Sequence, residues 1–157
     1  MASTYEKIAT TTFSSVADFT FTSIPATYTD LVIVFDGTAS GVTNLSMQFN
    51  SDTGSNYSYT YLLGTGSSAA SGRNSNETSG YLTAIYTGRT QVNISVQNYS
   101  NSTTYKTYLA RLSDATAQTS AMVGLWRSTS AISSVKILKL SGGTMSGNAT
   151  IYGIKAA

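Results

Sequence analysis

The chain has 157 residues, a length that fits one domain with a single hydrophobic core. Its formal net charge is +2 and its nine basic residues are scattered. Nucleic-acid-binding proteins need a concentrated basic face, so we expect no nucleic-acid partner. Because the chain contains no Cys and no His, disulfides, Ser-His-Asp triads and almost every kind of zinc site are excluded.

Segments in which apolar residues alternate with Ser, Thr or Asn follow one another along the chain, and none shows sustained helical periodicity. Leu45, Met47 and Phe49, for example, fall on one face of a strand, and the polar residues between them fall on the other. Ten or eleven short strands separated by Gly, Asn and Ser predict a β-sandwich or a β-barrel. The predicted strands are 5–12, 16–24, 30–36, 43–50, 57–63, 81–87, 90–98, 104–112, 119–127, 132–140 and 148–155.

Residues 64–80 break this pattern, because they include no apolar residue larger than Ala. Unstructured loops longer than about 12–15 residues are uncommon in compact domains and are usually functional or mobile. We therefore expect a flexible loop at 64–80. It is either a floppy surface loop or an arm that orders against a neighbouring subunit or a receptor through Arg73 and Glu77.

The composition predicts a surface that is uncharged and rich in hydroxyl groups. The chain has 25 serines and 25 threonines, and only 10% of its residues are charged, against about 25% in ordinary domains. No run approaches the ~18 apolar residues of a membrane-spanning helix, and no secretory signal is visible at the N-terminus. We expect no membrane partner.

Few side chains are suited to catalysis or metal binding. The two glutamates, Glu6 and Glu77, and five aspartates leave room for a glycosidase-type carboxylate pair, but no spacing supports one. Oxygen-bearing side chains at alternate positions in 50–56 could wrap a calcium ion. A single carboxylate, Asp52, is too few for tight binding, so a plain turn between strands is favoured. We expect no enzyme, no cofactor and no metal.

The candidate contact surface consists of aromatic side chains and a few charged ones. Three tyrosines in 57–61 project to one face of a strand, and Tyr offers a large contact area that can still form hydrogen bonds. The alternative is that these rings cap the core at a sheet edge. Trp126 beside Arg127 is either a stacking platform for a sugar or part of the core. The candidate contact residues are Tyr57, Tyr59, Tyr61, Arg73, Glu77, Trp126 and Arg127.

Four segments resemble small structural proteins of tailed bacteriophages, many of them from phages of cyanobacteria and other aquatic bacteria. These segments are Ser23–Leu31, Phe49–Ser58, Val123–Ser128 and Ile151–Lys155. The resemblance covers nearly the whole chain. It implies a virion structural protein, of the kind called a tail-fibre or capsid-surface protein, and it implies no catalytic residues.

We therefore expect one all-β domain over residues 1–157, an antiparallel two-sheet jelly-roll-like sandwich of about ten short strands. It is expected to be a non-enzymatic capsid decoration or cement protein on the virion surface, assembled in the bacterial host cytoplasm. A chain of this length has no room for the shaft of a fibre. The expected partners are the major capsid protein or tail proteins, and further copies of the chain, with a trimer matching a local three-fold position.

Two alternatives remain open. The first is a tail-fibre or receptor-binding protein that binds host surface glycans through its tyrosines and residues 64–80. The second is a glycan-active enzyme that uses Asp and Glu.

Overall fold

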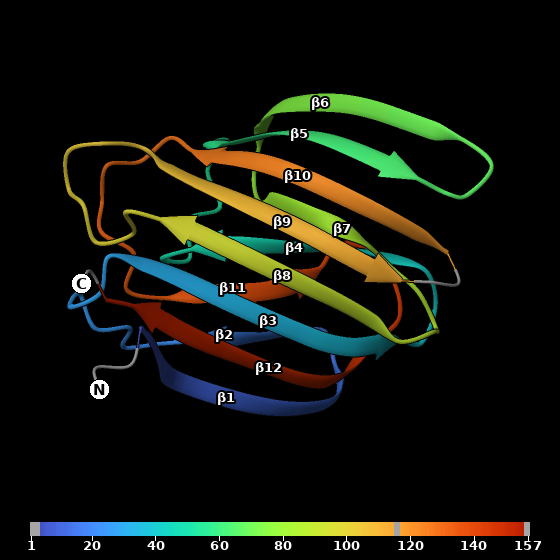
Figure 1. Cartoon of the computed structure of the whole chain (residues 1–157), viewed down its shortest axis with the longest axis horizontal. Helices are drawn as coiled ribbons and strands as arrows, with labels where there is room; N and C mark the ends of the chain where they lie inside the picture. The colour runs from blue at the N-terminus through green and yellow to red at the C-terminus, as the bar shows by residue number, and fades with distance from the viewer. Residues whose placement is uncertain (1–3, 115–116, 156–157) are drawn as a thin grey trace.

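The computed structural model describes residues 4–114 and 117–155, which form two antiparallel β-sheets (Figure 1). Within these residues no helix is long and apolar enough to cross a membrane. The strands are β1 (Tyr5–Val16), β2 (Asp18–Phe21), β3 (Asp30–Ala39), β4 (Thr43–Phe49), β5 (Tyr57–Gly64), β6 (Ala69–Glu77), β7 (Gly80–Ile85), β8 (Thr90–Gln97), β9 (Lys106–Asp114), β10 (Gln118–Trp126), β11 (Val135–Lys139) and β12 (Met145–Ile154).

Eight of these strands form a jelly roll. They pair as nested antiparallel ribbons: β1 with β12, β2 with β11, β3 with β8, and β4 with β7. The ribbons divide between the two sheets, so that β1-β12-β3-β8 faces β2-β11-β4-β7. This nested pairing of eight strands over two sheets is a jelly roll. The predicted jelly-roll-like sandwich is confirmed.

The other four strands widen one of the two sheets. Strands β9 and β10 form a hairpin that pairs with β8, and the hairpin β5–β6 pairs with β10. The large sheet therefore has the order β1-β12-β3-β8-β9-β10-β5-β6, twice the width of the four-stranded sheet. Figure 1 shows β5 and β6 at one margin of the molecule, beyond the smaller sheet.

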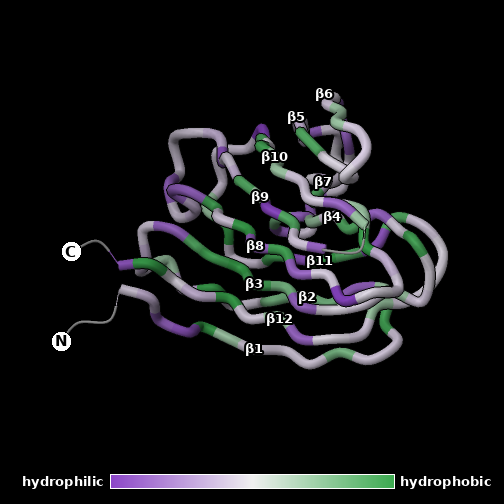
Figure 2. Tube along the Cα trace, turned by 45° about the vertical axis from the view of Figure 1, so that its right-hand side comes forward, coloured by the Kyte–Doolittle hydropathy of each residue, from purple (hydrophilic) through white to green (hydrophobic). Residues whose placement is uncertain are grey.

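The hydrophobic core lies between the two sheets and follows from the alternation in the sequence. Leu31, Ile33 and Phe35 of β3 point inward from the large sheet, and Leu45 and Met47 of β4 meet them from the small sheet; none of these five is exposed to solvent. Figure 2 shows hydrophobic positions recurring between hydrophilic ones along β8, β9 and β10. Each strand thus contributes one face to the core.

The structure corrects the prediction of a flexible loop at 64–80. Residues 69–77 form strand β6, which pairs with β5 from Gly64 to Tyr57. No alternation marks β6 in the sequence, because almost all of its residues are exposed and it buries no large apolar side chain. All eleven strands predicted from the sequence are present, so β6 is the strand that was missed.

Candidate interaction face

The face of the large sheet that points away from the small sheet is broad and solvent-facing, and we call it the outer face. Its residues line up across the strands because each strand pairs directly with the next from β1 to β6, and the register shifts only within β1 and at the Asn76 end of β6. One row consists of Lys7, Tyr152, Val32, Ser95, Leu109, Val123, Thr60 and Arg73. The next row consists of Thr10, Thr150, Val34, Asn93, Arg111, Ala121, Leu62 and Ser71.

Aliphatic side chains gather on this face over β9, β10 and β5. Leu62 is 63% exposed, Val123 is 57% exposed and Leu109 is 37% exposed. Val123 lies directly opposite Leu109, and Leu62 lies directly opposite Ala121. Single exposed apolar residues need no explanation, but a contiguous group on neighbouring strands is typical of an interaction site. We call these four residues the aliphatic patch.

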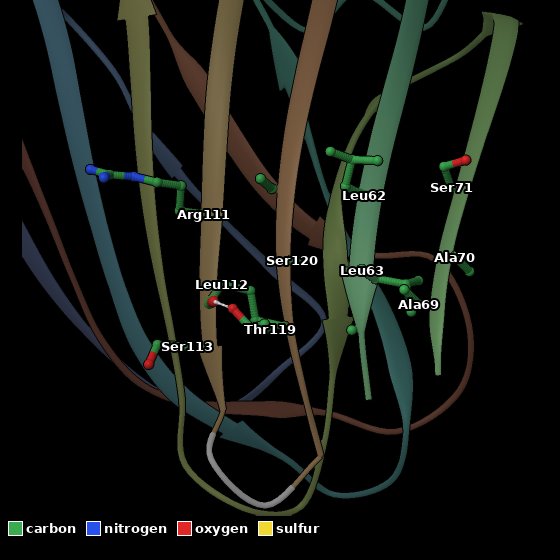
Figure 3. A pocket seen from close by; sticks show the side chains of 12 residues that line it. Leu62, Leu63, Ala69, Ala70, Ser71, Arg111, Leu112, Ser113, Thr119 and Ser120 are labelled. Atoms are coloured by element: carbon green, nitrogen blue, oxygen red, sulfur yellow. Dashed lines mark hydrogen bonds between the residues drawn. The ribbon is translucent and has the colours of Figure 1, made fainter. Parts of the chain in front are cut away.

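A groove of about 790 Å³ includes two residues of the aliphatic patch, Leu62 and Ala121 (Figure 3). It is lined by residues 111–113 and 119–121 on β9 and β10, and by residues 62–64 and 69–71 on β5 and β6. Its lining is mostly aliphatic or small, and Arg111 is its only ionisable residue. The groove therefore offers aliphatic and hydroxyl groups to a partner, with Arg111 at its margin.

Arg111 also borders a second hollow, of about 300 Å³, on the side of β3 and β8. In Figure 3 its side chain extends away from Leu62 and across β8. The ion pairs of the described residues are Arg89–Asp36, Lys136–Asp18 at 3.1 Å and Lys155–Glu6 at 2.7 Å. Because Arg111 belongs to none of them, its guanidinium group is available for contact.

The indole of Trp126 is in the core, which is the second of its two predicted alternatives and is incompatible with a sugar-stacking platform. Trp126 is only 2% exposed, and its ring packs 5.4 Å from the ring of Phe49 and 6.4 Å from that of Tyr57, centroid to centroid. Tyr57 is also fully buried, and its hydroxyl accepts a hydrogen bond of 2.9 Å from the backbone N–H of Phe49. Neither side chain can contact a partner, so both leave the candidate contact surface.

The segment between β4 and β5 is the turn that its sequence predicts. Asn50 and Ser51 have φ values of 52° and 57°, and the N–H of Asp52 donates to the carbonyl of Phe49 at 2.9 Å. These values are those of a type I′ turn.

Three donors hold the carboxylate of Asp52. They are the indole N–H of Trp126 at 2.7 Å, the amide of Asn56 at 2.9 Å and the N–H of Gly54 at 2.8 Å. Burial alone would raise the pKa of Asp52, but these hydrogen bonds outweigh burial and hold its pKa below the usual value. In residues 4–114 and 117–155, no three His, Cys, Asp or Glu side chains come together as a metal site would require.

The other two candidate tyrosines of β5 are half-buried on the inner side of the large sheet. The ring of Tyr59 lies 5.2 Å from that of Tyr81 on β7, and the ring of Tyr61 lies 6.3 Å from it. Burial raises the pKa of Tyr81 to about 12. The three rings fill the space between β5 and the edge of the small sheet, which corresponds to the alternative that these rings cap the core.

The remaining candidates lie on or beside β6. Arg73 is exposed on the outer face, whereas an extra residue at Asn76, with φ of 60°, puts Glu77 in register with Tyr57. Arg127 donates to the carbonyl of Ser55 at 2.6 Å and to the side-chain oxygen of Asn76 at 2.9 Å. It therefore braces the end of β6 against the end of β10, while Arg73 stays free for contact.

The two glutamates cannot act together as a glycosidase pair. Glu6 lies on β1 and Glu77 lies on β6, the opposite edges of the large sheet. At about 4.8 Å per strand, seven spacings separate these edges by roughly 34 Å. Catalytic carboxylates of glycosidases stand about 5–9.5 Å apart. Lys155 donates to Glu6 at 2.7 Å, and this hydrogen bond lowers the pKa of Glu6.

Sequence reasoning missed the aliphatic patch and Arg111. A signal was present, because Leu62-Leu63 and Met122-Val123 place apolar residues on both faces of their strands. One residue of each pair fills the core side and the other is left on the outer face. No protein-family model and no curated protein matches this chain in sequence.

Proposed function

We propose that this protein is a non-enzymatic surface protein of a bacteriophage virion, a capsid decoration protein that docks on the capsid through its outer face. The aliphatic patch on the outer face carries this proposal. Jelly rolls recur in viral capsid and lectin domains, and four segments of the chain resemble phage structural proteins. A fold alone does not assign a function, whereas an exposed aliphatic patch on neighbouring strands is typical of an interaction site.

The outer face has the size of a specific protein–protein interface. The eight strands span roughly 34 Å across the sheet, and six residues along β10 cover about 20 Å. Their product is about 700 Å², close to the ~800 Å² that one partner contributes to an interface of standard size. Exposed Leu62 and Val123 lie toward one side of this area, beside the hydroxyl groups of Thr60 and Ser71 and the arginines Arg73 and Arg111. An apolar cluster with polar side chains around it matches, on this side of the face, the apolar core and polar rim of an interface.

Cryo-electron microscopy of phage particles that carry this chain tests the location. We expect jelly-roll-sized density repeated over the capsid lattice. Density confined to the tail tip, or no density on the particle, would contradict the proposal.

A charge placed in the aliphatic patch tests the docking surface. Binding of purified Val123→Glu to particles that lack the protein should be at least tenfold weaker than binding of the unaltered chain. Val42→Glu is the matched control, because Val42 is 66% exposed but lies outside the outer face, between β3 and β4. Equal binding of the two variants would rule out docking through the aliphatic patch.

The groove favours a receptor-binding tail protein as the second candidate function. It offers a concave site beside Arg111, Ser113 and Ser71, whose side chains can donate hydrogen bonds to a host glycan. Its lining contains no aromatic ring, although stacking on such rings is a common part of sugar recognition. A glycan array probed with the unaltered chain and with Arg111→Ala checks this function. Specific binding that is lost in Arg111→Ala would favour it over capsid decoration.

A further inference from the structure

Three of the four edge strands in this fold carry features that hinder pairing with another chain. Strand β1 has an extra residue at Ile8 and a second irregularity between Phe13 and Val16. Strand β2 has only four residues, and β7 has an extra residue at Leu82 and packs against β10, β5 and β9. Bulges, short strands and cover are the means by which natural sheets protect their edges.

Strand β6, the other edge of the large sheet, lacks this protection. It has nine residues, and its pairing with β5 is regular from Ala69 to Ser75. This stretch contains no Pro and a single charge, Arg73, and nearly all of it is exposed. A long regular edge presents a row of unpaired N–H and C=O groups that can accept another strand.

The edge is also held rigidly in place. The ring of Tyr61 lies across Gly72, where a Cβ atom would overlap it. The amide of Asn74 donates to the Tyr59 hydroxyl at 2.8 Å, and Arg127 braces the far end of the strand. A strand that is already ordered loses little conformational entropy when it binds a partner.

We infer that β6 pairs antiparallel with β6 of a second copy of this chain, across a two-fold axis at Gly72. The irregularity at Asn76 limits regular pairing to residues 69–75, and Gly72 is the midpoint of this stretch. This register places Ser71 opposite the partner's Arg73 and Ala69 opposite the partner's Ser75. A register centred one residue later would place Arg73 opposite the partner's Arg73, and like charges directly opposite each other are destabilising.

A second copy of this chain fits the β6 edge because the two-fold axis joins both large sheets and brings both aliphatic patches to the same seam. Because the axis is perpendicular to the sheet, the two large sheets join into one sixteen-stranded sheet and both outer faces point the same way. Leu62 lies next to Ser71 across the β5–β6 pairing, so the two aliphatic patches come to flank the new seam. This inference goes beyond capsid docking and holds for the purified chain alone.

Sedimentation velocity over concentrations from low micromolar to near-millimolar tests this pairing. The unaltered chain should shift from monomer to dimer as its concentration rises. Ser71→Arg faces the partner's Arg73 with a like charge and should weaken dimerisation at least tenfold. Ser71→Glu faces it with an opposite charge and should strengthen dimerisation about threefold.

Ser113→Arg and Ser113→Glu are the matched controls, because Ser113 is an exposed serine of the outer face on β9, three strands from the edge. Both should dimerise as the unaltered chain does, and Trp126 fluorescence verifies that each variant is folded. A monomer at every concentration, a trimer, or equal responses to the Ser71 and Ser113 substitutions would overturn the inference. No capsid is present, so failure here is distinct from failure of the proposed docking.

Discussion

Replacing Asp52 with Ala removes the carboxylate that ties the turn between β4 and β5 to strand β10. Its oxygens accept hydrogen bonds from Trp126 at 2.7 Å, Asn56 at 2.9 Å and Gly54 at 2.8 Å. Trp126 is 2% exposed, whereas Gly54 is exposed and Asn56 is partly exposed. The indole N–H therefore has the least access to water once its acceptor is gone.

The expected loss follows from these three donors. An unsatisfied buried donor costs about 1–3 kcal/mol, and each of the two donors that can turn to water loses about 0.5–1 kcal/mol. We expect Asp52→Ala to lower the free energy of unfolding by about 2–5 kcal/mol. For a domain of this size, that lowers the melting temperature by roughly 4–20 °C.

Urea unfolding followed by tryptophan fluorescence measures this loss directly, because Trp126 is the single Trp of the chain. Asp18→Ala is the control, since the Asp18–Lys136 ion pair of 3.1 Å is partly exposed and such pairs contribute about 0–1 kcal/mol. A loss in Asp52→Ala no larger than the loss in Asp18→Ala would refute the assigned role of the carboxylate.

The loss of stability at acid pH tests the role of Asp52 a second time. Its folded pKa lies below the ordinary value of 3.8, so its contribution is complete above that value. The contribution is lost as the pH falls from about 4 through the lower folded pKa. The unaltered chain should therefore lose stability more steeply below pH 4 than Asp52→Ala does, as measured by urea unfolding at each pH. Parallel pH profiles of the two proteins would contradict this linkage.

Three further predictions concern packing and buried polar groups. A Cβ at Gly124 would overlap the buried ring of Tyr108, so Gly124→Ala should lower the free energy of unfolding in urea by about 1–3 kcal/mol. Gly142→Ala is the control, because a Cβ there has no atom within 4 Å and should change stability little. The Ser46 hydroxyl is buried without a hydrogen-bond partner, so Ser46→Ala should leave the melting temperature unchanged or raise it; a clear decrease would contradict this. Burial raises the pKa of Tyr81 to about 12, so the folded state favours its neutral hydroxyl. The resulting contribution to stability is complete below pH 10 and is lost as the pH rises from 10 through 12. Absorbance at alkaline pH should therefore show a late phase of tyrosine ionisation that Tyr81→Phe reduces.

The alternation of residues was enough to predict most of the fold. It placed eleven of the strands and assigned Leu45, Met47 and Phe49 to one face, and all three are buried in the core. The sequence also predicted the turn at 50–56, because Asn, Asp and Gly occur there in the order that turns favour. These features depend on neighbours in the sequence, so the sequence alone determines them.

The candidate site depended on contacts between distant segments. Alternation assigns Tyr57 and Tyr61 to the same face of β5, but one is fully buried and the other is partly exposed. The difference arises because the small sheet covers the inner face of β5 at Tyr57 and ends near Tyr61, whose ring reaches only the edge strand β7. Alternation along one strand predicts which residues share a face, whereas the burial of that face depends on strands that are far away in the chain.

The same reason applies to β6 and to the outer face. Strand β6 buries no large side chain and forms only because β5 offers it a paired edge, so its sequence carries no local signal. Leu109, Leu62 and Val123 become one patch only when β9, β10 and β5 lie side by side. The sequence determined the chemistry of each strand face, and the tertiary structure decided which faces were covered, because burial depends on strands that are distant in sequence and adjacent in space.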